Sequence, residues 1–166
     1  MGLANSGDVK EILEKNKEII FHVYNVSLTR NLRHIRRFIF EFSSLYKEIP
    51  DKIQEDEKFI ADVIKYLFSI SIELHSNKDV KSFFNEKMEQ WPWINMIREG
   101  NPLDKYGLSS NGLFHPKFWC EFIENGKLDR EFIFEYYNSS QYTNAQTRPI
   151  PIQLWSFREM DDDEFE

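Results

Sequence analysis

The chain has 166 residues, a formal net charge of -7 and an aromatic content of 16%. This length suits one ordinary domain, and the many Phe, Tyr and Trp residues supply enough apolar surface for a folded core, which excludes a disordered chain. The acidic balance disfavours general nucleic-acid binding because a phosphate backbone is repelled by it, and the single cysteine, Cys120, excludes an intrachain disulfide framework.

The first predicted element is a helix near the N-terminus. Apolar residues recur at helical spacing over 9–23, interrupted by the polar stretch 14–17. Asp8 is a suitable N-terminal cap for this helix. We expect the helix to end near Tyr24 or Asn25.

A second helix is predicted over 32–47, with Asn31 as its N-terminal cap. It should stop before Pro50, because the residue that precedes a proline is disfavoured in the helical conformation. One side of this helix carries apolar residues at spacings of three and four, which predicts a buried face. The expected buried residues are Leu32, Ile35, Ile39, Phe42 and Tyr46.

The middle of the chain predicts two more helices. Residues 50–57 form a polar connector, and 59–74 is the most apolar helical pattern of the chain, which we expect at the centre of a bundle. His75 follows it, where a cation suits the helix dipole. A shorter helix is expected over 78–90, and the Trp-Pro-Trp sequence at 91–93 is expected to pack between helices.

The periodic pattern fails over 99–116, where Gly, Pro, Ser and Asn predict a long loop without a glycine-rich phosphate cradle. Pro116 is expected at the first position of the next helix, and Gly126 is expected to end it. A further short helix is predicted over 129–137. Loops of this length are often functional, so 99–116 is a candidate contact surface.

The last part of the chain is expected to be extended. Prolines at alternate positions in 149–155 disfavour helix and predict an arm, and the run of acids in 158–166 is typical of a solvated tail. The predicted fold is therefore all-α, an irregular bundle of about six helices with a long loop and an extended C-terminal arm. The expected parts are a helical bundle over 1–98, packed segments over 99–157, and the acidic tail.

Motifs for catalysis, metal binding and membrane insertion are not found in the sequence. The four histidines are scattered and form no H-x-x-x-H pair, and no G-x-S-x-G elbow occurs. A nucleophile made of Cys120 and His115 is disfavoured, since the aromatic neighbours of Cys120 predict a buried, inert thiol. The longest apolar run, 66–72, is too short to cross a bilayer. We expect a soluble cytoplasmic protein with no cofactor or bound metal.

Four arginines fall within eight residues of the second predicted helix, at positions 30, 33, 36 and 37. Arg30, Arg33 and Arg37 recur at helical spacing on a face other than the apolar one. Guanidinium groups are planar, permanently charged and suited to binding phosphate with paired hydrogen bonds. The alternative is an ordinary solvated face, in which Arg37 pairs with Glu41 four residues later.

Residues 31–38, N-L-R-H-I-R-R-F, resemble the N-[PL]-R-x-[IL]-[KR]-x-[FL] signature of the helical lid in KAP-type and related AAA+-like P-loop NTPases. The resemblance implies that Arg33 is a second-sensor residue, which contacts the nucleotide phosphates. Residues 121–129, 138–142 and 154–155 are loosely similar to the C-terminal tails of bacterial P-loop proteins of this kind, some of which are associated with phage defence.

The chain lacks a Walker A lysine and a Walker B strand, and Leu32 stands where many members have proline. The resemblance therefore implies a non-catalytic lid or regulatory module, not an enzyme by itself. Its partner would be a P-loop NTPase core in cis or in trans, with Arg33, Arg37 and Arg30 as the phosphate-sensing residues. The alternative function is a protein-interaction domain without a nucleotide role. Nonspecific nucleic-acid binding by the arginine helix is the least favoured.

Overall fold

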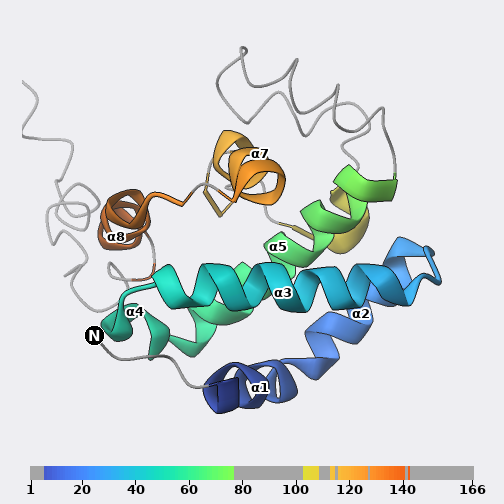
Figure 1. The fold of residues 1–166 in the computed structure, drawn as a ribbon, viewed down its shortest axis with the longest axis horizontal. Coiled ribbons are helices and arrows are strands. Elements are labelled where there is room, and N and C mark those ends of the chain that lie inside the picture. Colours follow the sequence, from blue (N-terminus) through green and yellow to red (C-terminus); the bar gives the residue numbers. More distant parts are fainter. Residues whose placement is uncertain are drawn as a thin grey trace, which may run out of the picture.

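The computed structural model describes residues 6–76, 103–108, 113–114, 116–126, 128–140 and 142. Within these residues the structure has seven α-helices and a short 3-10 helix, and no strand, which confirms the all-α prediction (Figure 1). The elements are α1 (Ser6–Lys15), α2 (Lys17–Ser27), α3 (Leu32–Glu48), α4 (Asp51–Gln54), α5 (Glu57–Ser76), η2 (Asp104–Tyr106), α7 (Pro116–Asn125) and α8 (Arg130–Ser139). The predicted helix 78–90, the Trp-Pro-Trp sequence, the arm 149–155 and the tail 158–166 lie outside the described residues.

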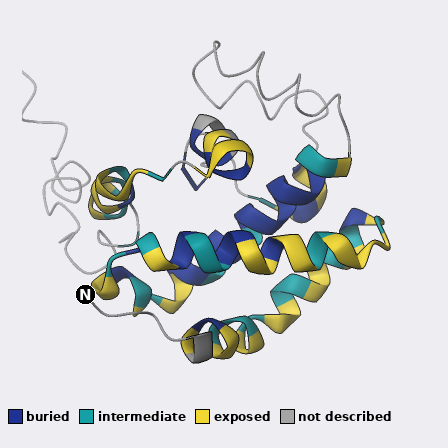
Figure 2. Cartoon of the chain, in the orientation of Figure 1, coloured by how far each residue is buried: buried dark blue, intermediate teal, exposed yellow. Residues whose placement is uncertain are grey.

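The central element is α5, as its apolar pattern predicts. It contacts α2, α3, α4 and α7, and almost all of its residues from Phe59 to Glu73 are buried (Figure 2). A helix with so wide an apolar arc must be covered by several neighbours, because leaving that arc exposed would keep large apolar surface in water. In Figure 1, α3 crosses α5, with α1 and α2 on one side of α3 and α7 and α8 on the other.

The N-terminal helix is divided into two, which corrects the prediction of a single helix. The division falls at Asn16, inside the polar interruption at 14–17, and the side-chain amide of Asn16 donates to the carbonyl of Ile12 over 2.9 Å. Asparagine favours such breaks because its side chain competes for backbone hydrogen bonds. The start also differs from the prediction, since α1 begins at Ser6 and Asp8 lies in its first turn rather than capping it.

Two segments predicted as connectors contain helical turns. The polar connector 50–57 includes α4, where Ile53 is buried and the Gln54 amide donates to the carbonyls of Tyr46 (3.1 Å) and Ile49 (2.7 Å). In the predicted loop 99–116, η2 holds the buried side chain of Tyr106. Buried apolar groups and paired polar groups order these short turns, although their sequences lack helical periodicity.

Residues at the ends of α3, α7 and α8 cap these helices. The Asn31 side chain accepts a hydrogen bond of 3.0 Å from the backbone N–H of Arg33, as predicted. Asp129, predicted as the first residue of a helix, instead caps α8 by accepting from the backbone N–H of Phe132 over 3.0 Å. At the end of α7, Gly126 adopts a φ of 65°, a left-handed conformation that glycine tolerates without a steric penalty. These caps satisfy backbone groups that would otherwise lack partners.

The buried face of α3 differs from the predicted one. The helix is rotated so that Phe38, Phe42 and Leu45 face the core, where the Phe38 ring stacks on Phe68 of α5 with ring centroids 4.5 Å apart. Phe42 and Tyr46 are buried as predicted, but Ile35 is only half-buried, and Leu32 and Ile39 are exposed. The alternative stripe buries larger aromatic side chains, so it removes more apolar area from water.

Candidate functional site

The outer face of α3 combines exposed apolar and basic side chains. We define this outer face as Leu32, Arg33, Arg36, Ile39, Phe40, Ser43 and Lys47. Its three large apolar side chains remain in contact with water, with exposed fractions of 66% for Leu32, 41% for Ile39 and 74% for Phe40. Exposed large apolar groups that gather on one face, rather than lying singly, are typical of interaction surfaces.

Arg33 and Arg30 are exposed at the N-terminal end of α3. Asn31 holds the backbone N–H of Arg33, and Arg30 lies in the link before the helix with a φ of 36°. Among the residues that the structure describes, the guanidinium groups of Arg30, Arg33 and Arg36 make no ion pair. These three cations are thus available to an anion from outside the domain.

Arg37 is placed differently. Its Nε donates over 3.1 Å to Oε1 of Glu41, whose side chain is only 8% exposed, so the pairing expected from the four-residue spacing is present. The Nε2 of His75, from α5, lies 3.7 Å from the same carboxylate oxygen. Arg37, whose side chain remains 51% exposed, therefore compensates a buried charge, whereas Arg33 has no such partner among the described residues.

His34 lies beside the cluster formed by Arg37, Glu41 and His75. Burial lowers the pKa of His34, and the nearby charges of His75 and Arg37 lower it further. Its Nε2 is 3.5 Å from the hydroxyl of Ser76. Within the described part of the chain, Oε2 of Glu41 and Nε2 of His75 have no hydrogen-bond partner, although both are buried. The cluster couples α3 to the end of α5 and makes the charge state of His34 relevant to stability.

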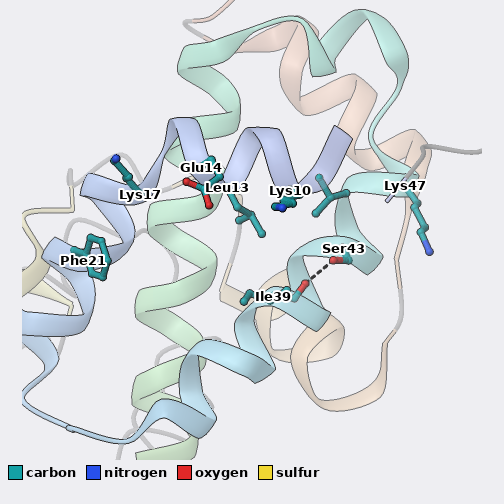
Figure 3. A pocket seen from close by; sticks show the side chains of 9 residues that line it. Lys10, Leu13, Glu14, Lys17, Phe21, Ile39, Ser43 and Lys47 are labelled. Carbon is teal, nitrogen blue, oxygen red and sulfur yellow. Dashed lines mark hydrogen bonds between the residues drawn. The ribbon is translucent and has the colours of Figure 1, made fainter. Parts of the chain in front are cut away.

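A groove lies where α1 and the start of α2 face α3 (Figure 3). It has a volume of about 560 Å³ and an apolar floor of Val9, Leu13, Phe21 and Ile39. Its other lining residues are polar, namely Lys10, Glu14, Lys17, Ser43 and Lys47. In Figure 3, Phe21 lies toward one end of the groove and Lys47 toward the other. No pattern in the sequence predicts this groove, because its walls come from separate helices.

In the described residues, no group of three or more His, Cys, Asp or Glu side chains could hold a metal ion. No helix in that part of the chain has both the length and the apolar character needed to cross a bilayer. The outer face and the groove combine apolar area with cations that make no ion pair with another described residue.

Comparisons of the chain with protein-family models, with curated proteins and with solved structures give no match.

Proposed function

We propose that this chain is a non-catalytic helical interaction module that docks on a partner protein through the outer face of α3. The main support is the exposure of Leu32, Ile39 and Phe40 on one helix, beside Arg33 and Arg36. Burying these side chains at an interface would remove apolar surface from water, and each fully buried side chain is worth about 1.5–3 kcal/mol.

The partner surface is expected to be apolar and acidic. Arg33 and Arg36 flank the exposed apolar groups and have no ion pair among the described residues. Aromatic and arginine side chains are enriched at the energetic centres of protein interfaces, and Phe40 is the most exposed aromatic group on this helix. Carboxylates or phosphates on the partner would pair with the guanidinium groups.

A second candidate narrows the partner to the nucleotide-binding core of a P-loop NTPase, for which this chain would act as a helical lid. It is supported by the resemblance of residues 31–38 and by the exposure of Arg33 at the N-terminal end of α3. Arg33, with Arg30 beside it, would then contact nucleotide phosphate. Arg37 is the weakest member of the expected phosphate-sensing set, because its guanidinium already pairs with Glu41.

Site-specific photo-crosslinking in cells tests the docking surface. A photoreactive amino acid placed at position 40 should capture one defined partner, whereas the same group at Phe134, which is also exposed but lies on α8, should not. Leu32→Ser together with Arg33→Glu should reduce the crosslink at position 40 at least fivefold. Equal capture from positions 40 and 134 would contradict a docking role for α3.

The captured partner then separates the two candidates. If it binds ATP, Arg33→Ala should lower the ATPase activity of the reconstituted pair about 10-fold or more, as expected for loss of an arginine that contacts transferring phosphate. Arg130→Ala, at an exposed arginine of α8 outside the proposed docking face, is the matched control and should retain activity. A partner without a nucleotide site would contradict the lid function and would remain consistent with the interaction module.

A further inference from the structure

The groove between α1 and α3 has cations that the described part of the domain does not neutralise. Lys10, Lys17 and Lys47 line it, and none of them makes an ion pair with another described residue. Glu14 is the one acid in the lining. The groove thus combines an apolar floor with a net positive rim, in a chain whose formal net charge is -7.

The segment 157–166 of the same chain has the complementary composition. Its apolar side chains are Phe157, Met160 and Phe165. Its charged side chains are one base, Arg158, and six acids, namely Glu159, Asp161, Asp162, Asp163, Glu164 and Glu166. Aromatic and methionine side chains suit an irregular apolar floor, because both fill shallow surfaces efficiently. Carboxylates at the rim would pair with lysines, in an interaction that salt screens.

We propose that segment 157–166 binds in cis to the groove between α1 and α3, with its apolar side chains on the floor and its carboxylates at the lysine rim. The occupant is a segment of this chain because the opposite charges meet within one molecule, and because attachment raises the local concentration of the segment to the millimolar range. Even a contact that is weak between separate molecules would then be largely formed.

The chain between Tyr142 and Phe157 is long enough for segment 157–166 to reach the groove. Tyr142 is anchored at the start of α5, where its hydroxyl donates to Oδ2 of Asp62 over 2.5 Å and its ring packs edge-on against Phe59. The same end of α5 approaches α1, since Nζ of Lys15 lies 4.0 Å from Oε1 of Glu57. Phe157 follows Tyr142 by 15 residues. An extended chain of that length spans about 50 Å, whereas the radius of gyration expected for a domain of this size is about 15 Å.

Occupation of the groove would also affect the outer face of α3. Ile39, Ser43 and Lys47 belong to both surfaces, so a bound segment would cover one end of the proposed docking face. Binding of the segment does not require the proposed function to be correct. The segment and an external partner would compete only if both proposals hold.

Zero-length carbodiimide crosslinking of the full chain tests the proposal, because it joins lysine amines only to carboxylates that they touch. Monomeric crosslinked protein should give peptides that join Lys10, Lys17 or Lys47 to the acids of 159–166. Their yield should exceed at least 10-fold that of crosslinks from Lys52, an exposed lysine on α4. The crosslink between Lys105 and Glu73, whose Nζ and Oε1 are 2.7 Å apart, is the internal standard for yield.

Substitutions should change the yield in both directions. Ile39→Glu on the groove floor and Phe157→Ser in the segment should each reduce the groove crosslinks at least fivefold. Glu14→Lys removes the one acid of the lining and should increase them about twofold or more. Because Ile39 and Glu14 are exposed, both variants should keep the helical circular dichroism and the yield of the internal standard.

Three results would overturn the proposal. They are the absence of groove crosslinks, an even spread of crosslinks over Lys52 and the groove lysines, and groove crosslinks confined to dimeric species. The last result would assign the groove to the segment of a second copy. Each leaves the photo-crosslinking at position 40 unaffected, so failure here is distinguishable from failure of the proposed docking face.

Discussion

Arg37 donates through Nε to Oε1 of Glu41 over 3.1 Å, and this contact gives two arginines on one helix different roles. The Glu41 side chain is buried, and His75 approaches the same oxygen from α5. Arg33, one turn earlier, is exposed and has no ion pair among the described residues. Spacing in the sequence groups the two arginines, whereas their contacts distinguish the counter-ion of a buried carboxylate from a cation without an ion pair among the described residues.

Arg37→Met is expected to lower the free energy of unfolding by about 1–3 kcal/mol, because it leaves the buried carboxylate of Glu41 with less compensation. Arg33→Met is the matched control and should change the free energy by less than about 0.5 kcal/mol, as for most surface substitutions. Urea unfolding followed by circular dichroism measures both. Equal losses from the two substitutions would show that the pair with Glu41 contributes nothing specific.

Phe38→Ala is expected to destabilise the protein by about 3–5 kcal/mol, since Phe38 is fully buried and stacks on Phe68. Phe40→Ala, two residues later, should cost less than about 0.5 kcal/mol because its ring is mostly in water. Thermal and urea unfolding of the two variants should differ clearly. The reverse order of stability would mean that α3 buries the opposite face.

Tyr106→Phe should reduce the free energy of unfolding by about 1–3 kcal/mol, because it removes a hydrogen bond to the buried carboxylate of Glu73. Burial, followed by the contact with Glu73, raises the pKa of the Tyr106 phenol, so its hydroxyl remains a donor at neutral pH. Lys105 also pairs with this carboxylate and limits the loss. A double-mutant cycle with Glu73→Gln should give a coupling of at least about 0.5 kcal/mol, and additivity would contradict the contact.

The free energy of unfolding should decrease as the pH is lowered, in part because of His34. Burial lowers the pKa of His34 from its ordinary value of 6.5, with further contributions from His75 and Arg37. As pH decreases below about 6.5, the unfolded state takes up this proton before the native state does, so native stability declines. His34→Gln should flatten the fall in unfolding free energy measured between about pH 7.5 and 5.5. Parallel curves for the two proteins would exclude His34 as a source of that fall.

Local interactions explain the elements that could be predicted. Asn31, Asp129 and Gly126 act on backbone groups within a few residues, so caps and helix ends are encoded where they occur. The continuous apolar character of α5 likewise requires a central position, whichever helices cover it. The cluster of arginines was visible in the sequence for the same reason, because its members are close neighbours along one helix.

The amino-acid pattern alone was thus sufficient to predict an all-α fold, several helix ends and the most buried helix. Which side of α3 faces the core depends on packing, because two apolar stripes share helical spacing and the contact of Phe38 with Phe68 selects one of them. Packing also decides that Arg37 faces a buried carboxylate while Arg33 faces water, and that α1 and α3 enclose a groove. These features depend on residues far apart in the chain, whose proximity arises from burial of the whole core rather than from any local pattern.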